Sequence, residues 1–350
     1  MIVCEVIKPG MFTTVQDLGR FGHQSQGVPV AGAMDSAALR LGNILLGNDE
    51  NAAGLEITVI GPTMKVLSGE ACFAVTGSEA GISKNGFPLP CWTAFWLAPG
   101  DVLSFAPSQN GGARPYLCVS GGFDVPLTMG SRSTYTRGGF GGYEGRALRT
   151  GDVIKTLAPD ALWAECRGLT CPPELRPTRD LCAPLRIIPG PQDDAFTEEG
   201  LETFFSAEYV ISNSADRMGY RLEGPSIAHR DSADIISDGI CLGSVQVPGD
   251  GQPIIMPADR QTTGGYAKIG VVCTVDLGNL AQRLTGQKVR FVKTTVAEAV
   301  SLLKQEAALL ERLKQLRARW RSRPQVPIAT KGSLNITVNG NPHYIEWEIL

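Results

Sequence analysis

The chain has few of the residues and motifs that most often mark a catalytic centre. Only three histidines occur among 350 residues (His23, His229 and His343), which argues against a histidine-based triad or a metal site made of several histidines. The sequence contains no Gly-x-x-x-x-Gly-Lys-Ser/Thr, no Gly-x-Ser-x-Gly and no His-Glu-x-x-His. A P-loop, an esterase-type nucleophile elbow and a zinc-protease helix are therefore excluded.

An excess of positive charge and a long apolar run are also lacking. The net charge is −3 and basic residues are dispersed, apart from a cluster near 312–323, which argues against nucleic-acid and membrane partners. No uncharged apolar run approaches the roughly 20 residues that span a bilayer. Residues 1–8 lack the basic segment of a signal peptide. We expect a cytoplasmic protein.

The nine cysteines include no Cys-x-x-Cys pair, and most lie in apolar, strand-like contexts such as that of Cys72. We therefore expect reduced thiols in the core. Cys166, Cys171 and Cys182 lie close together in sequence, but no histidine is near them, so no metal site is predicted.

Short β-type runs separated by turn residues dominate the chain. In the first half these runs are Ile2–Lys8, Glu56–Val59, Cys72–Thr76, Thr93–Leu97, Val102–Phe105 and Tyr116–Ser120. Such a rhythm is typical of an all-β barrel or sandwich and not of alternating βαβ units. Helical spacing of apolar residues appears over 34–45, before Gly47-Asn48, and over 296–316. A final hairpin is expected around Asn339-Gly340.

These patterns predict a mainly β protein with two domains, a few short helices and one C-terminal helix. Residues 1–160 form the first predicted β-barrel domain. Residues 157–184 lose periodicity and gain proline and cysteine, and residues 161–184 are assigned to a linker. Residues 185–350 form the second predicted barrel, which includes the C-terminal helix and hairpin.

The most informative segment runs from residue 246 to residue 266. Prolines and glycines surround an apolar stretch at 254–256, hydrogen-bonding side chains fill 259–263, and Gly264-Gly265 allows a sharp turn or a close approach to a ligand. A strand that delivers polar groups to a glycine-rich rim is typical of a binding site. The alternative is a tight hairpin with a solvated tip.

Asp259 and Arg260 within this segment cannot both face one side of a regular strand, because side chains alternate. Either one of them points inward, or the strand ends before them. An inward charge needs an opposite charge or a ligand. Asp216 and Arg217, on another glycine-flanked turn, are plausible partners. Asp216 is expected to stay ionised beside Arg217 and Arg221.

Two further polar clusters lie on glycine-rich turns. Gln16, Asp17, Arg20 and Asp35 surround the turn that leads into the early helix. The segment 130–146 contains Arg132 and a glycine-rich stretch framed by arginines, which suits either an anion cradle or a surface loop held by ion pairs. The concentration of such clusters favours one shared polar cleft.

Several long motifs resemble the allophanate hydrolase subunit 2 family, also called the KipA family or the family of 5-oxoprolinase C subunits. They are Thr14-Val-Gln-Asp-Leu-Gly-Arg20, Gly32-Ala-Met-Asp35, Gly121-Gly-Phe-Asp124, Gly130-Ser-Arg-Ser-Thr-Tyr135, Asp216-Arg-Met-Gly-Tyr-Arg221 and the segment 246–266. The resemblance covers roughly residues 2–300. It implies two cyclophilin-like β-barrels and partner subunits of the KipI and LamB/YcsF types.

The resemblance also implies a function. We expect one subunit of a 5-oxoprolinase that cleaves the small cyclic amide 5-oxoproline to glutamate. It would use ATP and Mg²⁺ at sites shared with the partner subunits. One alternative is the carboxyltransferase component of a biotin-dependent urea carboxylase. A second is a non-enzymatic, KipA-type antagonist that binds a KipI-type inhibitor of a histidine kinase. The predicted catalytic residues are Asp216, Asp259 and Arg260. The predicted substrate-binding residues are Gln16, Asp17, Arg20, Arg132, Arg217, Gln246, Gln261, Thr263 and Tyr266.

Overall fold

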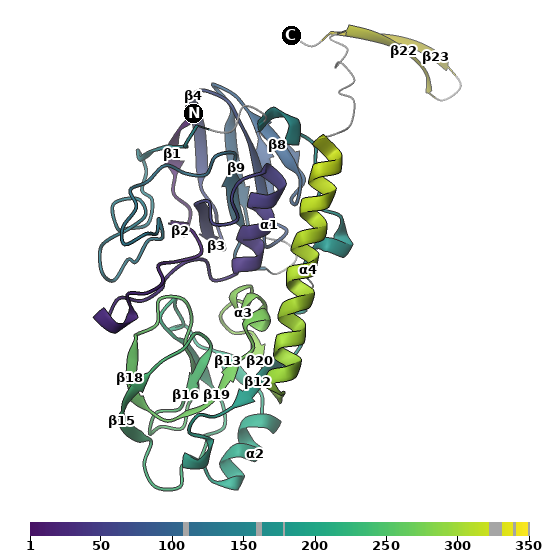
Figure 1. Cartoon of the computed structure of the whole chain (residues 1–350). Coiled ribbons are helices and arrows are strands. Elements are labelled where there is room, and N and C mark those ends of the chain that lie inside the picture. The colour runs from purple at the N-terminus through teal and green to yellow at the C-terminus, as the bar shows by residue number, and fades with distance from the viewer. Residues whose placement is uncertain (108–111, 159–162, 178, 322–330, 339–340, 349–350) are drawn as a thin grey trace.

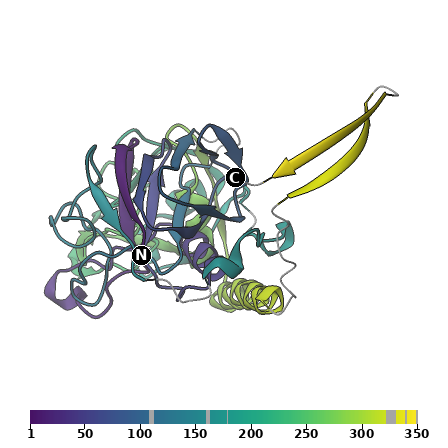
Figure 2. The ribbon, with the colours of Figure 1, turned by 90° about the horizontal axis from the view of Figure 1, so that it is seen from above.

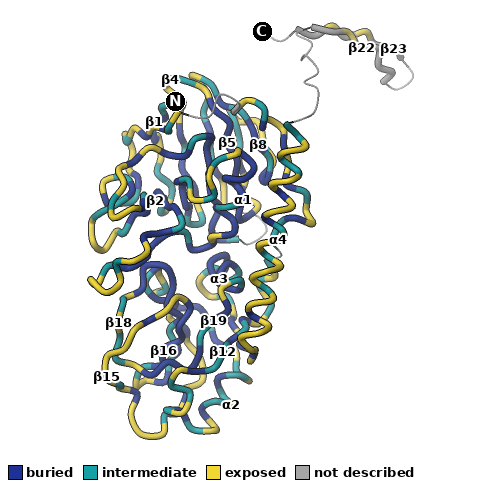
Figure 3. Tube along the Cα trace, in the orientation of Figure 1, coloured by how far each residue is buried: buried dark blue, intermediate teal, exposed yellow. Residues whose placement is uncertain are grey.

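The computed structural model describes residues 1–107, 112–158, 163–177, 179–321, 331–338 and 341–348 (Figure 1). The described chain is mainly β with four α-helices, which confirms the predicted fold class. Two halves, each built around β-sheet, lie end to end in Figure 1, and the long helix α4 (Val296–Arg321) runs along both. Buried segments concentrate inside each half (Figure 3).

The first half contains two antiparallel sheets. One has the strand order β11-β1-β4-β9-β6-β7 and the other has the order β2-β3-β10-β5-β8. The strands are β1 Val3–Lys8, β2 Phe12–Gln16, β3 Gly54–Thr58, β4 Thr63–Ser68, β5 Ala71–Thr76, β6 Gly81–Lys84, β7 Phe87–Leu89, β8 Ala94–Leu97, β9 Val102–Ala106, β10 Tyr116–Val119 and β11 Val153–Lys155. The core lies between these sheets and the helix that covers β5 and β10.

That helix, α1 (Ser36–Leu46), confirms the helix predicted from apolar spacing. It begins at Ser36 because the Asp35 carboxylate caps it, accepting the N–H of Ala38 at 3.2 Å. It ends at Gly47, whose φ of 75° is the left-handed conformation expected of a helix-terminating glycine.

The second half contains an eight-stranded sheet in the order β20-β13-β14-β17-β16-β19-β12-β21, in which only β12 and β21 pair in parallel. A separate two-stranded ribbon pairs β15 with β18. The strands are β12 Leu185–Pro189, β13 Tyr209–Ile211, β14 Tyr220–Glu223, β15 Asp234–Gly239, β16 Ser244–Gln246, β17 Ile254–Ile255, β18 Thr263–Tyr266, β19 Lys268–Val272, β20 Lys288–Val289 and β21 Phe291–Lys293. Two helices of this half, α2 (Glu198–Ser206) and α3 (Thr274–Ala281), were not predicted because eight or nine residues show too little periodicity.

Helix α4 joins the two halves. Its Leu310 and Leu313 are buried in the core of the first half, and the helix also contacts α3 of the second. Beyond it, β22 (Lys331–Val338) and β23 (Asn341–Glu348) form the predicted hairpin, whose turn at 339–340 lies outside the described residues. Figures 1 and 2 show this hairpin standing away from both halves. None of the helices described is both long and apolar enough to cross a membrane.

The boundaries predicted at residues 160 and 184 stay a prediction. Short 3₁₀ turns occupy Trp163–Cys166 and Pro173–Leu175 within the predicted linker. Leu169 and Leu175 from this segment pack into the core of the first half, while Met34 of the first half packs into the core of the second. The predicted linker therefore packs against the first half, and a side chain of the first half enters the core of the second.

Candidate functional site

A buried ion-pair cluster centred on Arg217 joins the two halves. Arg217 Nε and Nη2 donate to the two carboxylate oxygens of Asp259 at 2.9 and 2.8 Å. Its Nη1 donates to Glu56 Oε1 at 2.7 Å, and its Nη2 also donates to the Gly32 carbonyl at 2.7 Å. Glu56 lies on β3, whereas Asp259 follows β17, so the cluster crosses the interface. All three charged side chains are buried, and each depends on the others for its counter-charge.

Glu56 extends this cluster into the first half. Its Oε1 also accepts Arg114 Nη1 at 3.2 Å, and its Oε2 accepts the Tyr116 hydroxyl at 2.7 Å and the Met34 N–H at 2.8 Å. Burial by itself raises the pKa of Glu56, but the two guanidinium groups and the hydrogen bonds outweigh it and hold the pKa below its ordinary value. Glu56 is therefore an ionised anchor.

Asp35 provides a second polar link across the interface. Its Oδ1 accepts Arg179 Nη2 at 2.6 Å, and its Oδ2 accepts Arg179 Nε at 3.1 Å and Gln282 Nε2 at 2.9 Å. Gln282 follows α3 directly, so this carboxylate ties the N-terminus of α1 to the second half.

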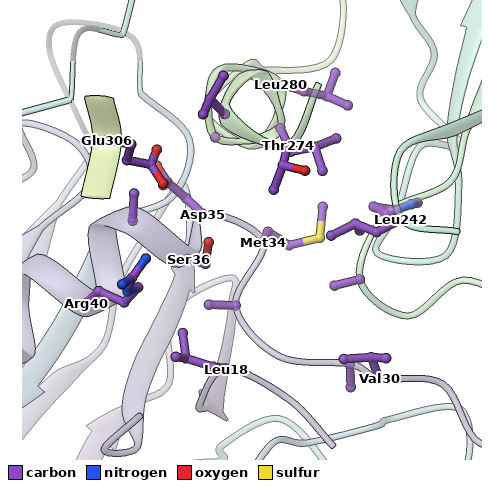
Figure 4. Close-up of a pocket in the computed structure, with 18 of the residues that line it drawn as sticks. Leu18, Val30, Met34, Asp35, Ser36, Arg40, Leu242, Thr274, Leu280 and Glu306 are labelled. Carbon is purple, nitrogen blue, oxygen red and sulfur yellow. The ribbon is translucent and has the colours of Figure 1, made fainter. Parts of the chain in front are cut away.

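A pocket of about 410 Å³ lies beside these links, between the two halves (Figure 4). Helices α1, α3 and α4 line it together with loops of both halves, and side chains such as Met34 and Leu280 make much of its wall apolar. Its charged lining residues are Asp35, Arg40, Glu50, Arg179, Arg260 and Glu306. A cavity of this size with an apolar wall and few polar groups has the usual form of a small-molecule site.

Arg260 is the predicted site residue that lines this pocket. Strand β17 ends at Ile255, and a turn carries Asp259 to the ion-pair cluster and Arg260 to the pocket. Arg260 is 6% exposed, and its Nε and Nη1 donate to the carbonyls of Ile240 and Pro257 at 3.1 and 3.3 Å. It pairs with no carboxylate of the described chain, and burial lowers its pKa. Arg260 therefore presents a cation that has no counter-charge among the described residues.

Gln16, Asp17 and Arg132 lie together in the first half. The Asp17 carboxylate accepts the hydroxyls of Ser131 and Ser133 at 2.7 and 2.5 Å and the Arg132 N–H at 2.6 Å. Gln16 Nε2 donates to the carbonyl of Thr134 at 3.2 Å, while its Oε1 is buried without a partner. These contacts hold the 130–134 turn against the end of β2.

Arg20 lies close to the interface cluster. Its side chain is 1% exposed, lies over the Phe140 ring with 5.0 Å from Cζ to the centroid, and donates through Nη2 to the Ser133 carbonyl. Burial lowers its pKa, while the charges of Asp17 and Asp259 oppose that effect. The charge of Asp259 in the second half therefore acts on Arg20 of the first.

The glycine-rich loop at 137–146 is packed against the protein rather than open around an anion. A Cβ at Gly141, where φ is 72°, would lie 2.1 Å from the Ser133 carbonyl oxygen. Arg146 is occupied by Glu144 and Asp152, at 2.6 and 2.7 Å. The second interpretation of this segment, a surface loop held by ion pairs, describes it better.

The remaining predicted residues lie apart from the pocket. Asp216 is exposed, and its carboxylate accepts the N–H groups of Met218 and Gly219 at 2.8 and 3.0 Å instead of a guanidinium. Gln246 is buried beneath the β15–β18 ribbon and donates to the Tyr266 carbonyl at 3.3 Å. Gln261, Thr263 and Tyr266 are exposed on or next to that ribbon. Their roles in binding stay predictions.

Three residues of the interface cluster were missed by sequence reasoning: Glu56, Arg114 and Tyr116. One usable signal was Glu56 between Leu55 and Ile57, because a charge inside an apolar strand needs a buried partner. Glu306 was also missed, since it lies on a helix whose face toward the pocket cannot be read from sequence. In the part of the chain that the structure describes, no three His, Cys, Asp or Glu side chains gather to hold a metal ion.

The chain belongs to the carboxyltransferase domain family, subdomains A and B, whose family model matches residues 26–293. It is 37% identical to the 5-oxoprolinase C subunit of Escherichia coli over 88% of this chain and 97% of that protein. It is also 37% identical to the 5-oxoprolinase C subunit of Haemophilus influenzae, over 87% of this chain and 95% of that protein.

Solved structures agree with this membership. The crystal structure of the K. lactis urea amidolyase matches with a TM-score of 0.82 and 30% identity, over 89% of this chain and 20% of that chain. The Kluyveromyces lactis urea carboxylase matches with the same TM-score of 0.82, over 29% of its own length. The chain thus spans a minor part of these two longer proteins.

Proposed function

We propose that this chain is one subunit of a cytoplasmic 5-oxoprolinase that cleaves 5-oxo-L-proline to L-glutamate with hydrolysis of ATP. The observation that carries the proposal is the match to two 5-oxoprolinase C subunits over 95% and 97% of their length. In this reaction the lactam C–N bond breaks, water supplies the new carboxyl oxygen, and the nitrogen takes up a proton. The expected partners are proteins of the KipI and LamB/YcsF types.

The site supports a binding and orienting role for this chain. Arg260 supplies the mainly apolar pocket with a cation that forms no ion pair within the described chain, which suits the carboxylate of 5-oxoproline. The Arg217–Asp259–Glu56 cluster fixes the turn that carries Arg260. The Asp259 carboxylate is paired with Arg217. The catalytic roles predicted for Asp259 and Asp216 therefore stay predictions. In the described part of the chain no three His, Cys, Asp or Glu side chains gather to hold a metal ion, and we propose that ATP and Mg²⁺ are bound at sites shared with the partner subunits.

Reconstitution tests this proposal. The purified chain is mixed with its KipI-type and LamB/YcsF-type partners, assembly is checked by size-exclusion chromatography, and glutamate is measured with 5-oxoproline and ATP present. We expect glutamate release that stops when this chain, ATP or 5-oxoproline is omitted. An assembled complex that releases none would refute the function.

A biotin-dependent carboxyltransferase acting on urea or a similar amide is the second candidate. The structural match to the Kluyveromyces lactis urea carboxylase supports it. The discriminating measurement is binding of free biotin to the chain in competition with urea. Tight, urea-sensitive binding of biotin favours this candidate, whereas no binding leaves the oxoprolinase as the proposal.

A further inference from the structure

The pocket between the halves contains one acid and one base that have no partner of opposite charge among the described residues. The acid is Glu306 on α4, and the base is Arg260 after β17. Neither forms an ion pair with any residue that the structure describes. Glu306 lies beyond residue 293, where the match to the family model ends, so this acid is not part of the matched domain.

The cations next to Glu306 are already engaged. Arg179 donates to Asp35 at 2.6 Å, and Arg40 donates to Glu50 at 2.5 Å. Figure 4 shows Glu306 beside Asp35. Burial raises the pKa of Glu306, and the charge of Asp35 adds to the rise, while Arg179 and Arg40 oppose it. A ligand with a hydrogen-bond donor would give the Glu306 carboxylate the partner that the described residues do not provide.

The opposite end of the pocket is basic. Leu242, which lies across the pocket from Glu306 in Figure 4, follows the Ile240 carbonyl that holds Arg260 Nε. Nε and Nη1 of Arg260 are engaged by backbone carbonyls, but Nη2 donates to none of the described residues. Met34 and Leu280 lie between the two ends in the figure and give the middle of the pocket an apolar wall.

We propose that this pocket binds a small carboxylic acid that also carries an N–H group, with the carboxylate on Arg260 and the N–H on Glu306. The ligand then provides a hydrogen-bonding partner for both Arg260 and Glu306, and its carbon skeleton contacts the apolar wall in the middle of the pocket. For the natural ligand the inference rests on the proposed function, because 5-oxoproline carries a carboxylate and a lactam N–H.

The test is calorimetric binding of three probes to the purified full-length chain. The probes are 5-oxo-L-proline, its methyl ester, which lacks the carboxylate, and the corresponding lactone acid, in which oxygen replaces the N–H. A hydrogen bond to a charged group contributes about 1.5–3 kcal/mol, so each analogue should bind roughly 10-fold to 100-fold more weakly. Arg260→Gln should abolish the preference for the acid over the ester, and Glu306→Gln the preference for the lactam over the lactone.

Matched variants control for the loss of a charge. Arg221→Gln in the same half as Arg260, and Glu311→Gln on the exposed side of α4, should keep both preferences. Each preference is the ratio of two dissociation constants measured on the same variant. Partial unfolding lowers the amount of active protein for both probes equally and does not alter this ratio. Equal preferences in Arg260→Gln, Glu306→Gln and wild type, or no binding of 5-oxoproline to the folded wild type, would overturn the inference.

The outcome is separable from that of the proposed function. If the reconstituted complex releases glutamate but the chain alone binds no probe, the proposed function holds and the pocket is not its binding site. If the chain binds the probes selectively but the assembled complex is inactive, the pocket is a binding site and the proposed function is refuted.

Discussion

At the residue scale, the interface depends on charges that satisfy one another. Arg217 links the carboxylates of Asp259 and Glu56, and these three side chains are at most 7% exposed. Removing one partner of such a group leaves uncompensated buried charge, which costs more than the pair itself contributes. The cluster is therefore expected to govern stability more than chemistry.

Arg217→Met should lower the free energy of unfolding by about 3–5 kcal/mol, because two buried carboxylates lose their shared cation. Urea denaturation of the purified chain measures the change. Arg221→Met, at an exposed position on β14, should change it by less than about 0.5 kcal/mol. Equal, small effects of both substitutions would show that the cluster does not stabilise the interface.

Glu306 gives a prediction about pH. Its pKa is raised in the folded chain, so the proton is bound more tightly there than in the unfolded chain. The stability that this group contributes is present below its unfolded pKa and is lost as the pH rises through the folded pKa. Glu306→Gln cannot ionise and should therefore raise the melting temperature relative to wild type more at pH 8 than at pH 5. A gain that is larger at pH 5 would contradict the assigned shift.

How far the site was predictable differs from residue to residue. Asp259 and Arg260 were found because adjacent charges cannot share one face of a strand, and the Arg217–Asp259 pair confirms the proposed partnership. Asp216 was expected beside a guanidinium but caps its own turn, because its backbone N–H neighbours lie closer. Glu306 was not predictable, since its position at the pocket depends on how α4 crosses the two halves.

At the scale of elements, helix α4 lines the pocket together with α1 of the first half and α3 of the second. Leu310 and Leu313 fix the helix on the first half, and Glu306 lies about one turn before Leu310 on the side of the pocket. Helix α1 and the C-terminal hairpin were predictable from strong local signals, a glycine cap and an Asn-Gly turn. Helices α2 and α3 were not, because they are too short to show a period.

Leu313→Ala should reduce the free energy of unfolding by about 2–5 kcal/mol, since Leu313 is fully buried and its removal leaves a cavity under α4. Denaturant titration measures the loss. Leu303→Ala on the same helix removes a side chain that is 39% exposed and should cost much less. If the two substitutions cost the same, α4 is not held by the packing described.

At the scale of the whole molecule, neither half contains the site alone. The first half supplies Glu56 and Asp35, the second supplies Arg217, Asp259 and Arg260, and α4 closes the pocket from the side. The mainly β architecture was predictable from the spacing of strands and turns. The contact between the halves was not, because it is made by side chains far apart in sequence, such as Glu56 and Arg217.

The most direct test of this account is the turnover of the reconstituted complex that carries Arg260→Ala. Because Arg260 forms no ion pair with the described chain, its loss should lower the melting temperature only modestly, yet 5-oxoproline-dependent glutamate release should disappear. Arg221→Ala in the same assay should keep wild-type turnover. Wild-type turnover with Arg260→Ala in an assembled complex would contradict the central claim that the pocket between the halves is the functional site.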